Sequence, residues 1–174
     1  EINAGYSAKR DFLTILTKYG IAIVSGLGTD PDAGIEFAKS IGPLRNSNFG
    51  ITFDVMSKPL PNNLAYTSHY LPLHTDLPNQ EIPPGFQFLH CILNEAEGGH
   101  SIFCDGLKIS ADLEHNDPDA FRLLRDTPIP YRFQDGTTDL INHRPVFALD
   151  DEGRVGMIIF NPHIAATFDM AADV

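Results

Sequence analysis

The chain has 174 residues, of which 43% are hydrophobic, enough to fill a packed core and to exclude a wholly disordered protein. Its 23 acidic and 12 basic residues give a formal net charge of −11, which repels phosphate backbones and argues against nucleic acid as a partner. No apolar run approaches the roughly 18 residues that cross a membrane, so no membrane partner is predicted either.

The first 42 residues predict two helices with a short strand between them. Ser7 and Thr29 can cap the helix starts, and Gly20 and Gly42 can end the helices. The predicted elements are a helix at 7–19, a buried strand at 21–24, and a second helix that begins near Pro31. We interpret this opening as a supporting layer, and we place the functional site further along the chain.

From about residue 50, short apolar runs alternate with Pro, Gly and Asn, a spacing typical of a β-sandwich or barrel. The runs are 53–56, 64–67, 71–74, 86–93, 101–104, 129–133, 145–149 and 155–160. One helical pair interrupts them, at about 107–115 and 118–126. The pattern therefore predicts a mainly β fold with flanking helices, in one domain that spans residues 1–174.

The chain contains two cysteines, Cys91 and Cys104, and their spacing does not match that of a zinc site. Both lie in apolar, strand-like runs. This placement favours buried, reduced thiols over a disulfide, as in a cytoplasmic protein. We therefore predict a cytoplasmic location.

A candidate metal site follows the run at 71–74, in the tripeptide His74-Thr75-Asp76. In an extended chain, residues two apart point to the same side, so His74 and Asp76 can converge on one ion. Two imidazoles and one carboxylate, with open positions beside them, are typical of non-haem Fe(II) oxygenases. We predict that His74 and Asp76 are iron ligands and catalytic residues. A second match, His115-Asn116-Asp117, precedes Pro118, where Asp117 is better explained as a turn or cap residue.

The region around this tripeptide resembles a known group of enzymes. The motifs are NLAYT at 63–67, LHTD at 73–76, PGFQFLHC at 84–91, GGHS at 98–101 and DG at 105–106. Together they resemble the γ-butyrobetaine hydroxylase and trimethyllysine dioxygenase group of the taurine-dioxygenase-like family. The resemblance runs from about residue 10 to the end of the chain. It implies a double-stranded β-helix (jelly-roll) core that binds Fe(II) and the co-substrate 2-oxoglutarate.

The same resemblance implies roles for individual residues. His74 and Asp76 match the family's first two iron ligands. Ser101 matches a hydroxyl residue near 2-oxoglutarate, although a serine at a strand edge after two glycines explains it equally well. Asn63 and Asn161 match positions near the substrate and co-substrate. We assign Asn63 to the binding of 2-oxoglutarate and Asn161 to the binding of the substrate.

Three aromatic residues, Phe49, Phe53 and Tyr66, match a cage that holds a trimethylammonium group in γ-butyrobetaine hydroxylases. Ring faces attract a cation that needs no hydrogen bonds. Two of these residues are Phe where that group tends to have Tyr and Trp, and Phe attracts a cation less strongly than Trp. The alternative is that Phe49 and Phe53 belong to an ordinary core.

Two parts of the family's site have no good match in this chain. The third iron ligand is a His far downstream, followed by an Arg that pairs with a carboxylate of 2-oxoglutarate. His143 and His163 are the available stand-ins. Arg154 follows His143 at a suitable distance, but His143 lies in a segment that resembles the family's middle region, and no Arg follows His163. We therefore expect the natural protein to be longer, with the last strands of the jelly roll beyond the C-terminal end of this chain.

The resemblance implies a reaction in which oxygen and 2-oxoglutarate give succinate, carbon dioxide and a hydroxylated substrate. The expected substrate is a small cationic molecule, with trimethylammonium compounds of the γ-butyrobetaine type first. One alternative is the same reaction on a phosphonate or sulfonate. Another is a non-catalytic binding module on the same scaffold, and a structural β-domain with chance motifs is the third. The resemblance also allows a homodimer.

Overall fold

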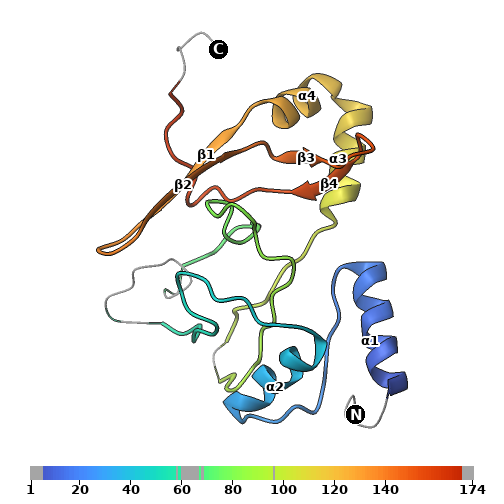
Figure 1. Ribbon diagram of the computed structural model, residues 1–174, viewed down its shortest axis with the longest axis vertical. Coiled ribbons are helices and arrows are strands. Elements are labelled where there is room, and N and C mark those ends of the chain that lie inside the picture. Colours follow the sequence, from blue (N-terminus) through green and yellow to red (C-terminus); the bar gives the residue numbers. More distant parts are fainter. Residues whose placement is uncertain (1–5, 58, 60–66, 68, 96, 170–174) are drawn as a thin grey trace. The chain divides into compact units, whose positions relative to one another are not determined.

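Helices and antiparallel strands both form in the computed structural model, which describes residues 6–57, 59, 67, 69–95 and 97–169 (Figure 1). The elements are α1 (Tyr6–Tyr19), α2 (Pro31–Ile41), α3 (Gly106–Asn116), α4 (Pro118–Asp126), β1 (Ile129–Gln134), β2 (Asp139–Arg144), β3 (Phe147–Leu149) and β4 (Val155–Ile158). The chain divides into two compact units. Unit 1 comprises Glu1–Leu44 and Gln87–Gly98, and unit 2 comprises Arg45–Phe86 and Gly99–Val174.

The two helices of unit 1 confirm the elements predicted for residues 7–19 and beyond Pro31. Gly20 ends α1 with a left-handed φ of 70°, and its N–H donates to the carbonyl of Leu16 at 2.8 Å. The predicted cap at Thr29 is wrong, because Asp30 caps α2 by accepting from the N–H of Asp32 at 3.0 Å. A carboxylate directly before Pro31 satisfies an otherwise unpaired helix donor and complements the helix dipole.

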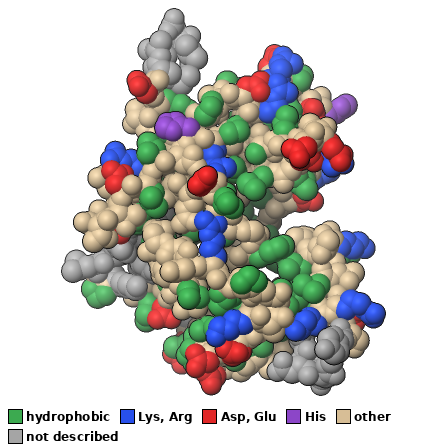
Figure 2. All heavy atoms as spheres, in the orientation of Figure 1, with side chains coloured by type: hydrophobic (Ala, Val, Ile, Leu, Met, Phe, Trp, Pro, Cys, Tyr) green, Lys and Arg blue, Asp and Glu red, His purple; other side chains and the backbone are tan. Residues whose placement is uncertain are grey.

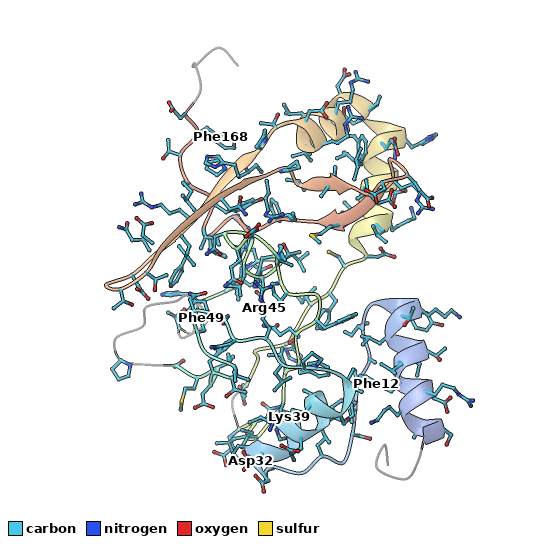
Figure 3. All side chains as sticks on the ribbon, viewed as in Figure 1. Phe12, Asp32, Lys39, Arg45, Phe49 and Phe168 are labelled. Carbon is cyan, nitrogen blue, oxygen red and sulfur yellow. The ribbon has the colours of Figure 1, made fainter. Side chains whose placement is uncertain are left out.

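Aromatic packing holds unit 1 together. Phe12 of α1 meets Phe37 of α2 edge to face, with ring centroids 5.2 Å apart, and Figure 3 labels Phe12 at this junction. Phe88 adds a third ring 6.1 Å from that of Phe37. Both Phe12 and Phe37 are buried. The segment 87–98 therefore packs on α2 through its side chains, although it forms no ladder in the described structure.

His90 packs closely against Gly34 in unit 1. The Nε2 atom of His90 lies 2.8 Å from the carbonyl oxygen of Gly28, so the ring is held over the start of α2. A Cβ added at Gly34 would lie 2.8 Å from Nδ1 of His90 and 2.9 Å from its Cγ. The imidazole therefore occupies the space that any side chain at residue 34 would need.

Replacing Gly34 with Ala is expected to change the free energy of unfolding with a sign that depends on His90. In the natural background the new methyl group clashes with the ring, and overpacking of this kind costs ~1–3 kcal/mol. In a His90→Gly background the clash is absent, because this change also removes the Cβ of residue 90, which lies 2.9 Å from the added carbon; Gly34→Ala should then stabilise the helix by up to ~1 kcal/mol. Urea unfolding of the four proteins measures both effects. The same sign in both backgrounds would contradict the contact.

Unit 2 contains two antiparallel hairpins (Figure 1). In the first, β1 pairs with β2 in a register that places Tyr131 opposite Asn142. Asp135 closes the turn by accepting from the N–H groups of Thr137 and Thr138 at 2.8 Å each, and these bonds lower the pKa of its carboxyl group. In the second, β3 pairs with β4, and Asp150 and Arg154 bracket the turn.

The core of unit 2 lies between the helical pair and the second hairpin. Phe121 of α4 and Phe147 of β3 stack with ring centroids 5.2 Å apart, and Val146 is buried with them. Five half-buried side chains surround this cluster: Leu113, Leu124, Ile129, Val155 and Ile158. The N–H of Val146 donates to the carbonyl of Leu124 at 2.9 Å, which ties the strand end to α4. Helix packing thus fixes the position of β3.

Several expected strands do not form. The runs 21–24, 53–56, 71–74, 86–93 and 101–104 lie outside every ladder of the described structure, and most of 64–67 lies outside the described residues. The predicted strands at these described runs are therefore wrong, because an apolar run without a partner strand cannot pair its backbone groups. The structure confirms β structure with flanking helices. A closed jelly-roll core stays a prediction.

These unpaired runs leave apolar side chains exposed, among them Phe86 and Phe103, each 65% accessible. Figure 2 shows hydrophobic side chains interspersed with acidic and basic ones on the visible face. Cys91 and Cys104 are free and exposed, so the expected burial of both thiols is wrong. None of the helices in the described residues has the length and apolarity that a membrane crossing requires.

Candidate active site

The segment His74-Thr75-Asp76 is anchored to the chain just beyond β4. The N–H of Thr75 donates to the carbonyl of Phe160 at 2.6 Å, and the Thr75 hydroxyl accepts from the N–H of Phe160 at 2.9 Å. The carboxamide of Asn161 donates to the carbonyl of Thr75 at 3.2 Å. All the polar groups of the central residue are therefore occupied by two consecutive residues that lie far away in the sequence.

The anchoring residues are themselves fixed to the scaffold of unit 2. The N–H of Ile159 donates to the carbonyl of Val146 at 2.8 Å, beside the Phe121 cluster. The hydroxyl of Tyr131, a fully buried residue of β1, donates to the carbonyl of Ile159 at 3.1 Å. Burial raises the pKa of the Tyr131 hydroxyl, which keeps it protonated and able to donate. The core of unit 2 thus determines where the candidate ligands lie.

His74 and Asp76 face each other, as the spacing of two residues predicts. The Nε2 atom of His74 lies 3.3 Å from Oδ1 of Asp76, and 25% and 33% of these side chains stay accessible. The Nδ1 atom of His74 lies 2.8 Å from the carbonyl oxygen of Pro72. With the Nδ1 N–H donating to that carbonyl, Nε2 can give up the proton that it shares with Asp76 and bind a metal ion, the arrangement usual for metal-bound histidines.

The carboxylate also affects the proton affinity of the imidazole. The hydrogen bond with Asp76 raises the pKa of His74, and partial burial opposes this increase. The contact with the carbonyl of Pro72 adds to the increase. A proton on Nε2 is therefore favoured between these two side chains, and a metal ion bound there would have to displace it.

The turn after Asp76 is held by side chains from β2. Leu77 adopts a left-handed φ of 52°, which is uncommon for a residue other than glycine. The carbonyl of Gln80 accepts from Asn142 at 3.0 Å and from Arg144 at 3.2 Å. Arg45 donates to the side chain of Gln80 at 2.8 Å. The chain is thus restrained between the candidate ligands, where residues 160–161 bond to Thr75, and after them, where β2 bonds to Gln80.

Two of the three predicted cage residues lie together. The ring centroids of Phe49 and Phe53 are 6.0 Å apart, and Phe49 also meets Phe133 of β1 edge to face at 5.2 Å. Figure 3 labels Phe49 beside the β1–β2 hairpin. Phe53 remains 44% exposed while Phe49 is half-buried, so Phe53 is the more accessible of the two rings. Tyr66, the third cage residue, lies outside the described residues.

The other predicted residues are dispersed. Asn161 is buried against Thr75, which places it next to the ligand pair, and its role toward substrate stays a prediction. Ser101 is exposed, and its role beside 2-oxoglutarate stays a prediction. Asn63 lies outside the described residues. Asp117 caps α4 by accepting from the N–H of Ala120, as its position before Pro118 predicts.

The third ligand is not found in the described part of the chain. No group of three His, Cys, Asp or Glu side chains there is arranged to hold a metal ion. His143 lies on β2, and Arg154, its expected partner, is engaged by Asp150 and Glu152. His163 donates its backbone N–H to the side chain of Asn161. The donors present supply two positions of an Fe(II) site, an imidazole nitrogen and a carboxylate oxygen, and these types fit that ion.

Sequence reasoning missed two residues that support the site, Thr75 and Tyr131. Thr75 stands between the two ligands, so the motif itself contained it, but only its partners in the fold show what its hydroxyl does. Tyr131 lies in a run that was correctly predicted as a strand. The one available signal was a phenol in an apolar strand, which usually finds a hydrogen-bond partner when buried.

Comparison with known proteins finds one family model, the taurine catabolism dioxygenase TauD, TfdA family, which matches residues 4–172. The chain is 44% identical over 162 residues to a gamma-butyrobetaine dioxygenase of Pseudomonas sp. (strain AK-1), covering 93% of this chain and 42% of that protein. It is 36% identical over 168 residues to the gamma-butyrobetaine dioxygenase of Homo sapiens, and the match covers 94% of this chain and 42% of the human protein. A mitochondrial trimethyllysine dioxygenase of Gallus gallus is 28% identical over 134 residues, and the match covers 77% of this chain and 32% of that protein. The chain thus spans less than half the length of these relatives.

Proposed function

Because the chain belongs to the taurine catabolism dioxygenase TauD, TfdA family, we propose that its protein is an Fe(II)- and 2-oxoglutarate-dependent dioxygenase. The proposed reaction hydroxylates a small trimethylammonium substrate of the γ-butyrobetaine type. In this proposal residues 1–174 belong to one oxygenase domain with a jelly-roll core, as the family match over nearly the whole chain supports. The single observation that carries the proposal is the facing pair His74 and Asp76.

In this site the chain would hold iron through Nε2 of His74 and a carboxylate oxygen of Asp76. Bound iron supplies the redox chemistry with oxygen and 2-oxoglutarate. The carboxylate would offset part of the charge of the ion, and an Nδ1 N–H donating to the Pro72 carbonyl would leave Nε2 as the nitrogen that binds it. Two protein ligands on one side leave the remaining positions for a third ligand, the co-substrate and oxygen.

The substrate class is supported by the aromatic pair and by the relatives. Gamma-butyrobetaine dioxygenases are named among the similar proteins. Phe49 and Phe53 offer adjacent ring faces, and Phe53 is accessible to a ligand. A trimethylammonium group needs a desolvated, electron-rich surface without hydrogen-bond donors, and ring faces provide one. Asn161, next to Thr75, is the amide available for the rest of the substrate.

An anaerobic titration of the purified full-length protein with Fe(II) and 2-oxoglutarate tests the function directly. A chelated 2-oxo acid gives a visible charge-transfer band, and in air succinate should form in step with a hydroxylated trimethylammonium product. If the band appears but succinate forms only with a phosphonate or sulfonate substrate, the proposed reaction stands and the proposed substrate class changes. If neither a band nor succinate appears, the non-catalytic binding module becomes the better explanation.

Replacing Phe53 with Leu is expected to weaken binding of a trimethylammonium ligand. Leu keeps an apolar side chain but removes the ring face, and a cation–π contact contributes ~0.5–2 kcal/mol. That range corresponds to a loss of roughly 2- to 30-fold in affinity. Calorimetry with γ-butyrobetaine and with its neutral tert-butyl analogue measures the effect. Equal losses for the two ligands would show that Phe53 contributes only apolar contact.

A further inference from the structure

Thr75 is the only residue between the two candidate iron ligands, and its side chain points away from them, toward the backbone of Phe160. The hydroxyl accepts from the N–H of Phe160 at 2.9 Å and lies 3.4 Å from the carbonyl oxygen of the same residue. The backbone N–H of Thr75 donates to that carbonyl at 2.6 Å. Residue 75 and residue 160 are therefore joined by both a backbone bond and side-chain contacts.

The alternation of side chains in an extended segment explains this division of roles. His74 and Asp76 point to one side, and residue 75 points to the other, where the chain beyond β4 runs. Any shift or rotation of residue 75 therefore changes the directions in which both neighbours point. A hydroxyl that fixes residue 75 against a rigid segment restricts the angle between the imidazole and the carboxylate.

The partner segment is rigid enough to serve as that reference. Ile159 is 1% exposed and bonds through its N–H to the carbonyl of Val146, and through its carbonyl to the hydroxyl of Tyr131. Asn161 is 9% exposed, and its carboxamide bonds to the carbonyl of Thr75. Residues on both sides of Phe160 are thus buried and bonded, so movement of Thr75 cannot be followed easily by movement of its partner.

We propose that the hydroxyl of Thr75 is a positioning group, which orients His74 and Asp76 for one metal ion by fixing the backbone between them to Phe160. This inference rests on the proposed function, since it assumes that the pair holds a metal. Outer partners that orient ligands are worth roughly 10- to 100-fold in metal affinity when they are removed. The hydroxyl acts through the backbone and touches neither the metal nor the substrate, so Thr75 is a positioning residue.

The test compares Thr75→Val and Thr75→Ser with the natural full-length protein. Val has nearly the shape of Thr and the same branching, and it lacks the oxygen that accepts from Phe160. Ser keeps that oxygen and loses one methyl group. Titration with Co(II), whose visible bands report ligand geometry, gives the metal affinity and the spectrum. Urea unfolding of the same three metal-free proteins gives their stability.

Thr75→Val is expected to weaken Co(II) binding about 10-fold or more and to alter the visible bands, while Thr75→Ser keeps most of the affinity and the natural spectrum. Natural affinity and spectrum in a folded Thr75→Val protein would overturn the inference and leave the proposed function in place. A loss of stability in that variant without a change in affinity would also overturn it, since the role would then be only structural. Failure of the natural protein to bind Co(II) would overturn the proposed function, and this inference with it.

Discussion

Replacing His74 or Asp76 with Ala is expected to abolish iron binding and turnover while the chain stays folded. Each residue supplies one of two facing donors, and the ion would be left with a single protein ligand in the described site. Loss of a direct ligand should exceed the roughly 10- to 100-fold effect of losing an outer partner. Both side chains are partly exposed and neither belongs to the core cluster, so the free energy of unfolding should change little.

The measurement is the charge-transfer band that Fe(II) and 2-oxoglutarate give without oxygen, followed by succinate formation in air. His115→Ala is the matched control, because His115 belongs to the second His-x-Asp tripeptide, where Asp117 serves as a helix cap. The band should vanish in His74→Ala and in Asp76→Ala and persist in His115→Ala. Iron-dependent turnover in both ligand variants would refute the assignment of the site.

Replacing Phe121 with Ala should lower the free energy of unfolding by ~3–5 kcal/mol, the usual effect of removing a buried aromatic ring. Phe121 is 4% exposed, and its ring stacks on that of Phe147. A typical domain has only ~5–15 kcal/mol of stability, so this loss is a large fraction of the total. Val146 lies in the same cluster and accepts from Ile159, so the anchor of Thr75 should loosen as well.

Urea unfolding measures the first effect, and hydrogen exchange at the amides of Thr75 and Ile159 measures the second. Leu123→Ala on the same helix is the control, since Leu123 is 62% exposed and should change stability by at most ~0.5 kcal/mol. Similar destabilisation by the two variants would mean that the described cluster is not the core of unit 2. Unchanged exchange at Thr75 in Phe121→Ala would mean that the core does not support the ligand segment.

Helices were predictable, with their ends correct to within about two residues, because their signals are local. The predicted span 118–126 coincides with α4, and Asp117 and Pro118 mark its start as expected. The shift of the α2 cap from Thr29 to Asp30 is a choice between adjacent residues of similar capping ability. Since capping and turn formation depend on residues within a few positions, a single sequence contains most of the information.

Strands were less predictable because a strand depends on its partner. The apolar runs 86–93 and 101–104 have strand-like composition, and the described structure pairs neither of them. Conversely, β2 was missed, since its sequence DLINHR is largely polar. Its register with β1, and the salt bridge between Arg132 and Asp139, hold it in place. Composition reports a tendency toward extended structure, and pairing decides whether a ladder forms.

The sequence by itself determined that His74 and Asp76 face each other, because a spacing of two residues in an extended segment places them on one side. Only the tertiary structure decided what holds that segment, since Thr75 meets Phe160 across 85 residues and Phe49 meets Phe133 on β1. Such contacts require a long loop to close, and closure is driven by burial of the whole core around Phe121 and Phe147. No short motif encodes whether core burial outweighs the cost of closing such a loop. The contacts of Thr75 and Phe49 were therefore visible only in the folded chain.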